Sequence, residues 1–176
     1  MSLISLLLLS LSSTLFAIPY GIQYDSVATD DLESKGCLLC YQAAYLEKTS
    51  SDHILSCAGP VLFVGAAYTP FNRETIVYLG AFALAQEVHK ITELNTPHES
   101  NGAYWYFTPG KSFGFLKDTD LHQKPTADTG TTNADSRLSW NLDNDRSGYR
   151  TGMYINLYND SMFQKTIYNC PIDFKG

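Results

Sequence analysis

Hydrophobic and aromatic residues occur in short runs along most of the chain, and Gly, Pro, Asn and Asp separate these runs. Residues 112–116 and 138–142 alternate apolar with polar or small side chains, which is the period of a half-buried strand. Polar residues at 143–148 predict a turn, so the strand before them forms a hairpin with the strand after them. The strands expected from these runs are residues 61–67, 75–85, 103–108, 112–116, 138–142, 149–157 and 163–169.

Three segments carry helical signals. Residues 75–85 begin with strand-forming residues, but the alanines from Ala81 onward favour a helix, and we choose strand for this segment. Residues 37–47 predict a short helix. Ser51 can cap a second short helix over 52–55, which the Gly59-Pro60 pair ends.

The division of the chain follows from these elements. Residues 18–36 contain Gly and Pro and show no apolar period, so we expect an extended or mobile lead-in there. Residues 37–176 are then one β-rich domain. Residues 118–136 are poor in apolar side chains and predict a long surface loop, a type of loop that often binds ligands. The expected fold is mainly β, an antiparallel β-sandwich or jelly-roll-like barrel with one or two short N-terminal helices, clamped by disulfides.

The first 17 residues have the pattern of a secretory signal peptide. Residues 3–11 are almost entirely Leu and Ile, too short a run to span a bilayer, and the segment ends at the small residue Ala17. An uncleaved anchor is the alternative, since no Lys or Arg precedes the apolar run. We expect cleavage after Ala17, no membrane span in the mature chain, and a secreted, extracellular protein.

Four cysteines, Cys37, Cys40, Cys57 and Cys170, follow the leader. An even number in an exported chain indicates two disulfides. The preferred pairing joins one of Cys37 and Cys40 to Cys57 and the other to Cys170. The CxxC spacing of the first two also fits a redox dithiol or half a zinc site, but a second close pair and a βαβ setting are missing from the sequence.

The net charge of the chain limits the classes of partner that it can bind. The chain has 12 Lys and Arg against 18 Asp and Glu, which gives a net charge of −6. Such a protein lacks the basic surface that neutralises phosphates, so nucleic acid and anionic membranes are not expected partners.

The sequence lacks the familiar catalytic motifs of hydrolases, metalloproteases and nucleotide-binding enzymes. Its four histidines are scattered, and none is spaced from another like metal ligands on one helix face. The pair His98-Glu99 could supply an acid or a base, so a small secreted hydrolase with a site near His98, Glu99 and Asp143 to Asp145 remains an alternative. We therefore leave the enzyme question open, with binding favoured.

The turn at 143–148 resembles the start of a calcium loop. Asp143 and Asp145 occupy positions one and three, and Gly148 occupies position six. Tyr154 stands at position twelve, where an EF-hand has Glu, and the flanking segments are strands. A solvated hairpin tip is the favoured interpretation, with Ca²⁺ bound by Asp143 and Asp145 as the alternative.

Four aromatic residues in succession, Tyr104 to Phe107, give the strongest functional signal. Neighbouring residues of a strand face opposite ways, so one pair can enter the core while the other faces away. Aromatic rings beside amide and carboxylate groups suit a carbohydrate site, whereas the structural alternative has Trp105 and Trp140 in a sandwich core with tyrosines at its margin. The ligand-binding residues that this pattern predicts are Tyr104, Tyr106, Asp143, Asn144, Asp145 and Tyr149.

Asn159 begins an N-x-S sequon and is a candidate glycosylation site on an exported chain. Taken together, the sequence favours a secreted, lectin-like module that binds glycans or another extracellular surface ligand. The alternatives are the hydrolase and a secreted protein-binding or structural factor.

Overall fold

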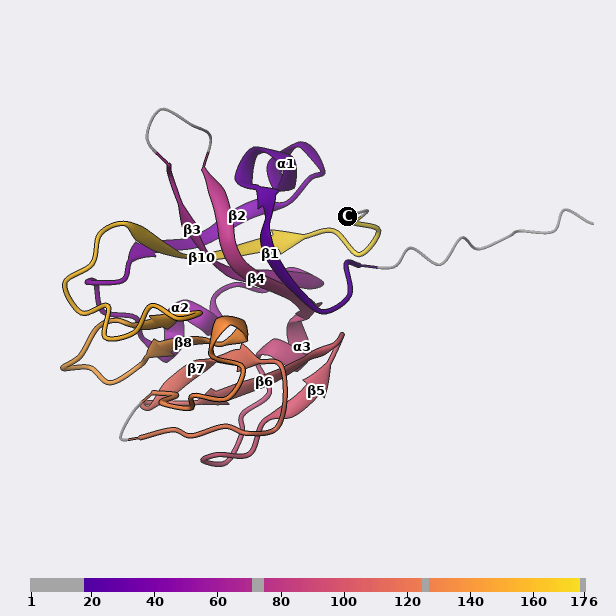
Figure 1. Ribbon diagram of the computed structural model, residues 1–176. Helices are drawn as coiled ribbons and strands as arrows, with labels where there is room; N and C mark the ends of the chain where they lie inside the picture. The colour runs from indigo at the N-terminus through magenta and orange to yellow at the C-terminus, as the bar shows by residue number, and fades with distance from the viewer. Residues whose placement is uncertain (1–17, 71–74, 125–126, 175–176) are drawn as a thin grey trace, which may run out of the picture.

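The computed structural model describes residues 18–70, 75–124 and 127–174, which form a sandwich of two antiparallel sheets (Figure 1). The first sheet, sheet A, has the strand order β1-β4-β3-β10-β2, and the second, sheet B, has the order β5-β6-β7-β8-β9. Sheet A consists of β1 (Ile22–Ala28), β2 (Leu38–Ala44), β3 (Val61–Tyr68), β4 (Ile76–Leu84) and β10 (Phe163–Cys170). Sheet B consists of β5 (His98–Ser100), β6 (Ala103–Thr108), β7 (Ser112–Leu116), β8 (Leu138–Asn141) and β9 (Tyr149–Thr151).

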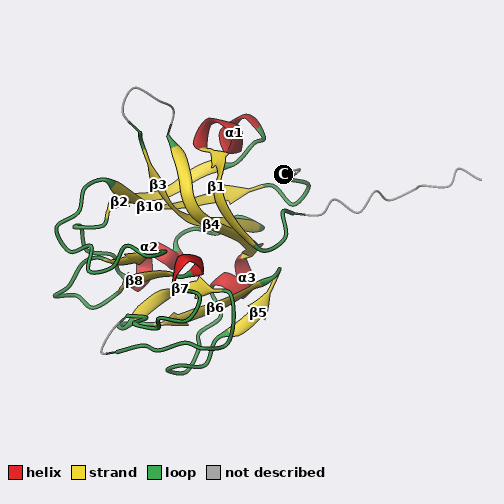
Figure 2. Ribbon diagram, viewed as in Figure 1, coloured by secondary structure: helices red, strands yellow, loops and turns green. Residues whose placement is uncertain are grey.

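Short helices lie at the margins of the two sheets (Figure 2). They are α1 (Thr29–Ser34), α2 (Ser51–Leu55), α3 (Ala85–Val88) and the 3₁₀ turn η1 (Ala134–Ser136). Helix α1 lies on the side of sheet A that faces away from sheet B, whereas η1 belongs to the loop that follows β7. This placement gives sheet A cover on both faces.

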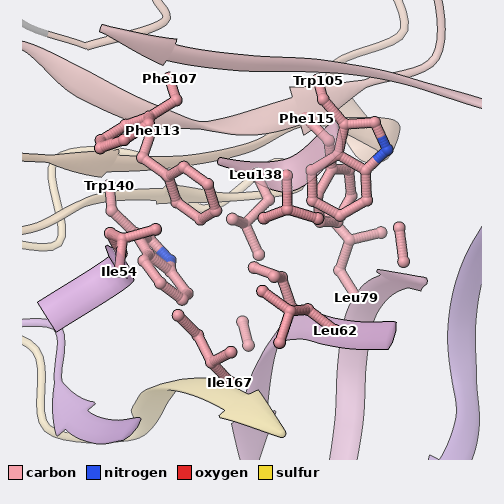
Figure 3. Packing of buried hydrophobic residues seen from close by; sticks show 14 of the residues in the cluster. Ile54, Leu62, Leu79, Trp105, Phe107, Phe113, Phe115, Leu138, Trp140 and Ile167 are labelled. Carbon is pink, nitrogen blue, oxygen red and sulfur yellow. The ribbon is translucent and has the colours of Figure 1, made fainter. Parts of the chain in front are cut away.

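The main core fills the space between the sheets (Figure 3). Leu62, Leu79 and Ile167 project from sheet A toward aromatic side chains of sheet B. Trp105 and Trp140 are fully buried there, so the expectation that both tryptophans fill a sandwich core is confirmed. Burying such large apolar surfaces is the dominant favourable term in folding.

A second apolar cluster covers the outer face of sheet A. Leu32 of α1 and Phe174 of the C-terminal segment pack with Phe63 and Phe82. Because both faces of the sheet are buried, seven of the eight residues of β3 are buried, and its sequence is a continuous apolar run.

Two disulfides fasten sheet A, and as expected one of Cys37 and Cys40 bonds to Cys57 and the other to Cys170. Cys37 bonds to Cys170 across 133 residues, and Cys40 bonds to Cys57 across 17 residues. The first bond joins the start of β2 to the end of β10. In the loop-entropy description, closing a loop of this length stabilises the fold by roughly 4–5 kcal/mol.

Most strands of the structure were predicted from the sequence. The strands expected at 61–67, 103–108, 112–116, 138–142 and 163–169 are present, and the antiparallel sandwich is confirmed. The strand chosen for residues 75–85, which also carried a helical signal, is confirmed as Ile76–Leu84. The helix α3 follows it directly. In the hairpin, β9 ends at Thr151 rather than 157, since Gly152 adopts φ 56° and the chain turns there.

Two expectations for the N-terminal part were wrong. Residues 37–47 contain β2 rather than a helix, because pairing with β10 outweighs the local helical preference. Residues 18–36, expected as a lead-in, contain β1 and α1, so the folded domain begins well before Cys37. The short helix at 51–55 is confirmed, although Ser50 rather than Ser51 is its N-cap. The leader expected at 1–17 lies outside the described residues.

A lysine lies in the middle of this apolar structure. Lys165 sits on the same face of β10 as Phe163 and Ile167, and its side chain is fully buried. Its Nζ donates hydrogen bonds to the carbonyl oxygen of Glu47 and the hydroxyl of Thr49. Burial lowers the pKa of Lys165 to about 8, despite the opposing charge of Glu47.

Trp140 anchors the core from sheet B. Its Nε1 donates to the hydroxyl of Tyr45 at 3.1 Å, and its ring packs against Phe113. Trp140→Ala should lower the free energy of unfolding by roughly 3–5 kcal/mol in denaturant titrations, through lost burial and a cavity. Ile91→Ala, at a position 67% exposed, is the matched control and should stay within about 0.5 kcal/mol of the parent. Equal stability of the two variants would contradict this description of the core.

Lys165 should make the domain more stable as the pH rises above neutrality. The folded pKa of Lys165 is below its ordinary value of 10.5, so the folded state releases this proton first and the unfolded state binds more protons between about pH 8 and 10.5. The free energy of unfolding should therefore increase by roughly 1 kcal/mol between pH 7 and pH 9. Above pH 10 the gain should reverse, because burial raises the pKa of Tyr45 and Tyr106, and the unfolded state then loses protons first. Lys165→Met should flatten the rise, and a rise that persists in this variant would assign it to another group.

Candidate functional site

The expected aromatic residues of β6 lie on the outer face of sheet B. Tyr106 is fully buried, and its hydroxyl donates to the carbonyl oxygen of Leu138 at 3.2 Å. Tyr104 is half-buried and packs against the small cluster of Tyr106, Leu116 and Leu121. The long loop after β7 covers these residues, so Tyr106 presents no face to solvent.

The turn after β8 is at the other end of the sheet. The amide of Leu142 donates to the carbonyl oxygen of Lys111 at 2.9 Å, which places the turn beside the hairpin that joins β6 to β7. Tyr104 pairs with Leu116 at the opposite end of that hairpin. The structure therefore does not bring Tyr104 together with the turn at 143–145.

The residues expected to bind calcium or a ligand, Asp143, Asn144 and Asp145, form a turn closed by its own hydrogen bond. Asn144 and Asp145 are exposed, and an Oδ1 of Asp143 accepts a hydrogen bond from the amide of Asp145 at 3.0 Å. Tyr149 is only 8% exposed. Across the described residues, no three His, Cys, Asp or Glu side chains gather as ligands for a metal. Calcium binding at Asp143 and Asp145 thus stays a prediction, as does glycosylation of Asn159, whose side chain is exposed.

His98 and Glu99 are also distant from the turn at 143–145. His98 lies in β5, and β6 and β7 separate it from β8 in the sheet. Its Nε2 is 3.5 Å from a carboxylate oxygen of Glu87, and burial lowers its pKa. The composite acid–base site considered for a hydrolase is therefore not assembled.

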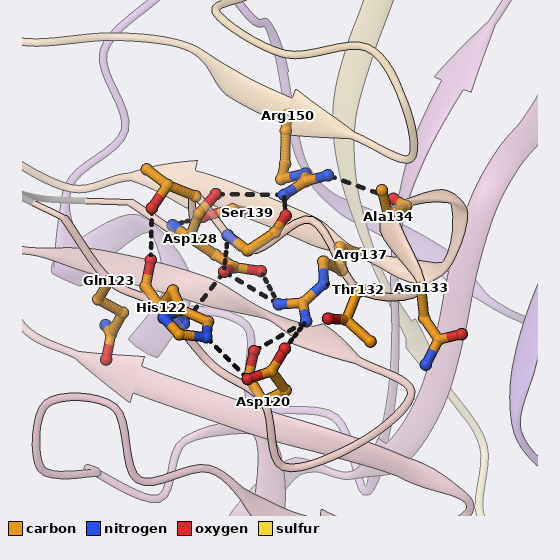
Figure 4. A network of polar contacts seen from close by, with 12 residues as sticks. Asp120, His122, Gln123, Asp128, Thr132, Asn133, Ala134, Arg137, Ser139 and Arg150 are labelled. Atoms are coloured by element: carbon orange, nitrogen blue, oxygen red, sulfur yellow. Dashed lines mark hydrogen bonds and ion pairs between the residues drawn. The ribbon is translucent and has the colours of Figure 1, made fainter.

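A buried ion pair fixes the loop over sheet B (Figure 4). Arg137 and Asp128 are both fully buried, and Nη1 of Arg137 lies 2.9 Å from Oδ2 of Asp128. The amides of His122 and Gly130 donate to Oδ1 of Asp128, at 3.2 and 2.9 Å. Arg137 also donates to the carbonyl oxygen of Thr132. These bonds hold both halves of the loop.

A second guanidinium completes this network. Arg150 of β9 is 2% exposed and donates to the carbonyl oxygens of Gly130, Ala134 and Gly152. Each nitrogen of the Arg150 guanidinium therefore donates to a backbone carbonyl oxygen. The charge of Asp128 is neutralised by Arg137. Neither guanidinium is therefore free to pair with a ligand at the surface above.

A pocket of about 200 Å³ opens between this loop and the segment after β9. We call it the loop pocket. Met153 and Ile155, which line it, are 66% and 51% exposed and give it an apolar rim. The residues around it are Thr129, Gly130, Thr131, Ala134, Tyr149, Arg150, Met153 and Ile155.

Next to the loop pocket, Tyr68, Tyr78 and Tyr154 pack together at one end of the sandwich, and the hydroxyl of Tyr24 bonds to Ser136 of η1. We call Tyr24, Tyr68, Tyr78 and Tyr154 the tyrosine cluster. The ring of Tyr78 meets those of Tyr68 and Tyr154 edge to face, with centroids 6.2 and 5.6 Å apart. Tyr24 and Tyr154 are 45% and 47% exposed, so the cluster is open to solvent.

The close approach of Tyr78 depends on a glycine. A Cβ on Gly152 would lie 3.1 Å from the Tyr78 ring, and the residue has φ 56°. The turn at Gly152 lets Tyr154 pair with Thr151 and brings its ring onto Tyr78. A side chain at 152 would be strained and would press on that ring.

Two carboxylates flank the cluster. Asp25 has φ 43° and lies in a bulge of β1, where the pairing with β4 shifts between Tyr24 and Val27. Bulges of this kind redirect side chains at the edges of sheets. On the other side, the hydroxyl of Tyr24 donates to Ser136, which in turn donates to Asp135.

The hydroxyl of Tyr78 is available as a donor. Burial raises its pKa, with smaller contributions from neighbouring tyrosines and from Asp25 and Asp135, so the group is protonated at neutral pH. Tyr68, Tyr78, Asp25 and Asp135 were missed in the sequence. Alternation within β4 could have suggested Tyr78, but nothing local indicated that β1, η1 and the turn after β9 meet.

The buried ion pair should be the main support of this surface. Arg137→Met leaves Asp128 buried without its partner and should cost roughly 3–5 kcal/mol in the free energy of unfolding. The double variant Arg137→Met with Asp128→Leu removes both charges and should recover part of that loss. Denaturant titration of the two variants tests this. A single variant as stable as the parent would show that the pair does not hold the loop.

Comparisons with protein-family models, with curated proteins and with solved structures gave no match for this chain. In the part of the chain that the structure describes, no helix is both long and apolar enough to cross a membrane. A function for this protein therefore has to be argued from the geometry of its surface.

Proposed function

We propose that this protein is a secreted, lectin-like binding module and that the tyrosine cluster, together with the loop pocket, recognises neutral glycans. The observation that carries the proposal is the group of partly exposed tyrosine rings with carboxylates beside them, Asp25 and Asp135. Sugar rings have apolar C–H faces and many hydroxyl groups. Aromatic faces and hydrogen-bonding groups placed side by side match both features.

The chemistry of the surface favours a neutral ligand. Arg137 and Arg150 have their hydrogen bonds taken up by Asp128 and by backbone oxygens, so they offer little attraction to a polyanion. The net charge of −6 would repel one as well. Thr131 is exposed beside the apolar rim of the loop pocket and can exchange hydrogen bonds with a sugar hydroxyl.

Rigidity also supports a binding role. Ligand affinity is lost when a binding loop must be ordered on association, and the buried ion pair orders the loop in advance. The two disulfides are compatible with an oxidising, extracellular environment. The hydrolase alternative gains no comparable support, because its residues lie apart in the fold.

The proposal is tested by a broad glycan array with the oxidised, full-length secreted protein. We expect binding to a restricted set of neutral glycans. Tyr154→Ala should weaken binding of such a glycan by about tenfold, through the loss of one aromatic contact. The melting temperature should change little, because Tyr154 is nearly half-exposed. A blank array for well-folded protein, with and without calcium, would overturn the glycan proposal.

Tyr104→Ala is the matched control, since Tyr104 was expected in the site but lies on the outer face of sheet B. It should bind like the parent. Loss of binding in Tyr104→Ala, with full binding in Tyr154→Ala, would refute the assignment to the tyrosine cluster. Binding that a chelator abolishes would support a calcium site, for which Asp143 and Asp145 are the residues to substitute first.

A further inference from the structure

The outer face of sheet A carries a separate cavity of about 280 Å³, between β1, α1 and the C-terminal segment. Its apolar walls are formed by Val27, Leu32, Phe82 and Phe174. The tyrosine cluster belongs to the other side of this sheet, because Tyr68 and Tyr78 pack against the main core while Val27 packs into the outer cluster. We call this cavity the outer pocket.

Aromatic side chains make up much of the apolar wall. The rings of Phe82 and Phe174 are nearly parallel, with centroids 5.0 Å apart and an interplanar angle of 29°. Both residues are almost fully buried, so the wall is held by the second apolar cluster rather than by mobile side chains. Such a wall suits a flat aromatic or a branched aliphatic group.

An ion pair lies at the mouth of the same cavity. Nζ of Lys35 is 3.4 Å from Oδ2 of Asp31, and it lies 6.0 Å from the centre of the Phe174 ring. The side chains of Lys35 and Asp31 are 37% and 60% exposed, so both charges can be reached from solvent. Gln23 and Ser26 add neutral polar groups to the rim.

We propose that the outer pocket binds a small zwitterion with an apolar side chain, of the class of free aromatic α-amino acids. The side chain occupies the wall of Leu32, Phe82 and Phe174. The carboxylate pairs with Lys35, and the ammonium pairs with Asp31. A ligand with one charge would satisfy only one member of this pair and leave the other without its partner, whereas a zwitterion replaces the pair with two new ones.

The exposed ion pair of Lys35 and Asp31 can be replaced by two ion pairs with the ligand. An ion pair in contact with solvent contributes little to stability, so opening it costs little. The free energy of binding then comes mainly from the apolar side chain entering the cavity. For a ligand of this size we expect a Kd on the order of 0.1–1 mM.

The experiment is a titration of the ¹⁵N-labelled, disulfide-intact protein with L-phenylalanine, followed by two-dimensional NMR. Saturable shifts are expected at the amides of Gln23, Leu32 and Lys35. Phenethylamine and 3-phenylpropionate, which each carry one of the two charges, should bind at least tenfold more weakly. Equal binding of either compound would overturn the zwitterion assignment, and the absence of saturable shifts with all three would overturn the site.

Variants locate the binding. Ser26→Trp, at an exposed position on the rim, fills the cavity without disturbing the core and should abolish the shifts. Lys35→Gln and Asp31→Asn should each weaken binding about tenfold. Lys117→Gln, at an exposed lysine directly after β7, is the charge-matched control and should bind like the parent. Unchanged binding in Ser26→Trp would place the ligand elsewhere.

This proposal does not depend on the glycan site. Tyr154→Ala should leave the phenylalanine titration unchanged, and Ser26→Trp should leave glycan binding unchanged. Parallel loss of both activities in either variant, with a preserved melting temperature, would contradict the separation of the two sites by sheet A.

Discussion

The ion pair between Arg137 and Asp128 is the interaction on which the surface of sheet B depends. Two fully buried charges 2.9 Å apart are tolerated because backbone amides and carbonyl groups satisfy their remaining hydrogen-bonding positions. The pair joins β8 to the middle of a loop that has little apolar content of its own. With the loop fixed, η1 can meet β1 through the contact of Tyr24 with Ser136. The contact of Tyr24 with η1 therefore depends on this charge network, whereas Tyr68 and Tyr78 pack against the main core.

Strand β1 supplies residues to both candidate sites of sheet A. It is an edge strand, and its pairing with β4 is interrupted by the bulge at Asp25. Before the bulge, Ile22 packs against the main core, whereas Val27 after it packs against the outer cluster. The same strand thus contributes Tyr24 to one candidate site and Val27 to the other. A regular strand would also alternate its faces, but the extra residue adds a local twist at Asp25, between Tyr24 and Val27.

The sequence predicted the features that depend on local patterns of residues. It missed those that depend on contacts between segments far apart in the chain. Trp140 alternates with polar residues, and its burial could be inferred from that period, but Ser139 and Asn141 are buried as well, so the strand is not half-buried as the period predicted. That one of Cys37 and Cys40 bonds to Cys57 and the other to Cys170 could be expected from the sequence, but which of the two bonds to Cys57 could not. By contrast, β2 resembles a helix locally, and only its pairing with the C-terminal strand makes it a strand. Tyr104 and Tyr106 were good aromatic candidates by sequence, but the loop that covers them comes from a polar segment whose burial could not be predicted without Arg137 and Asp128. For the same reason the tyrosine cluster, drawn from four separate elements, had no local signature.

The two proposed sites differ in how the protein uses its charges, and this difference decides their ligand chemistry. Breaking the buried pair of Arg137 and Asp128 would cost roughly 3–5 kcal/mol, so a small ligand cannot recruit either of these two charges, and no cation of this pair is free to attract an anionic ligand. The pair of Lys35 and Asp31 is exposed and contributes about 0–1 kcal/mol, so a ligand that offers both complementary charges can replace it. A neutral glycan suits the first surface and a zwitterion suits the second. The same residue types thus support different recognition on the two sheets, because their burial differs.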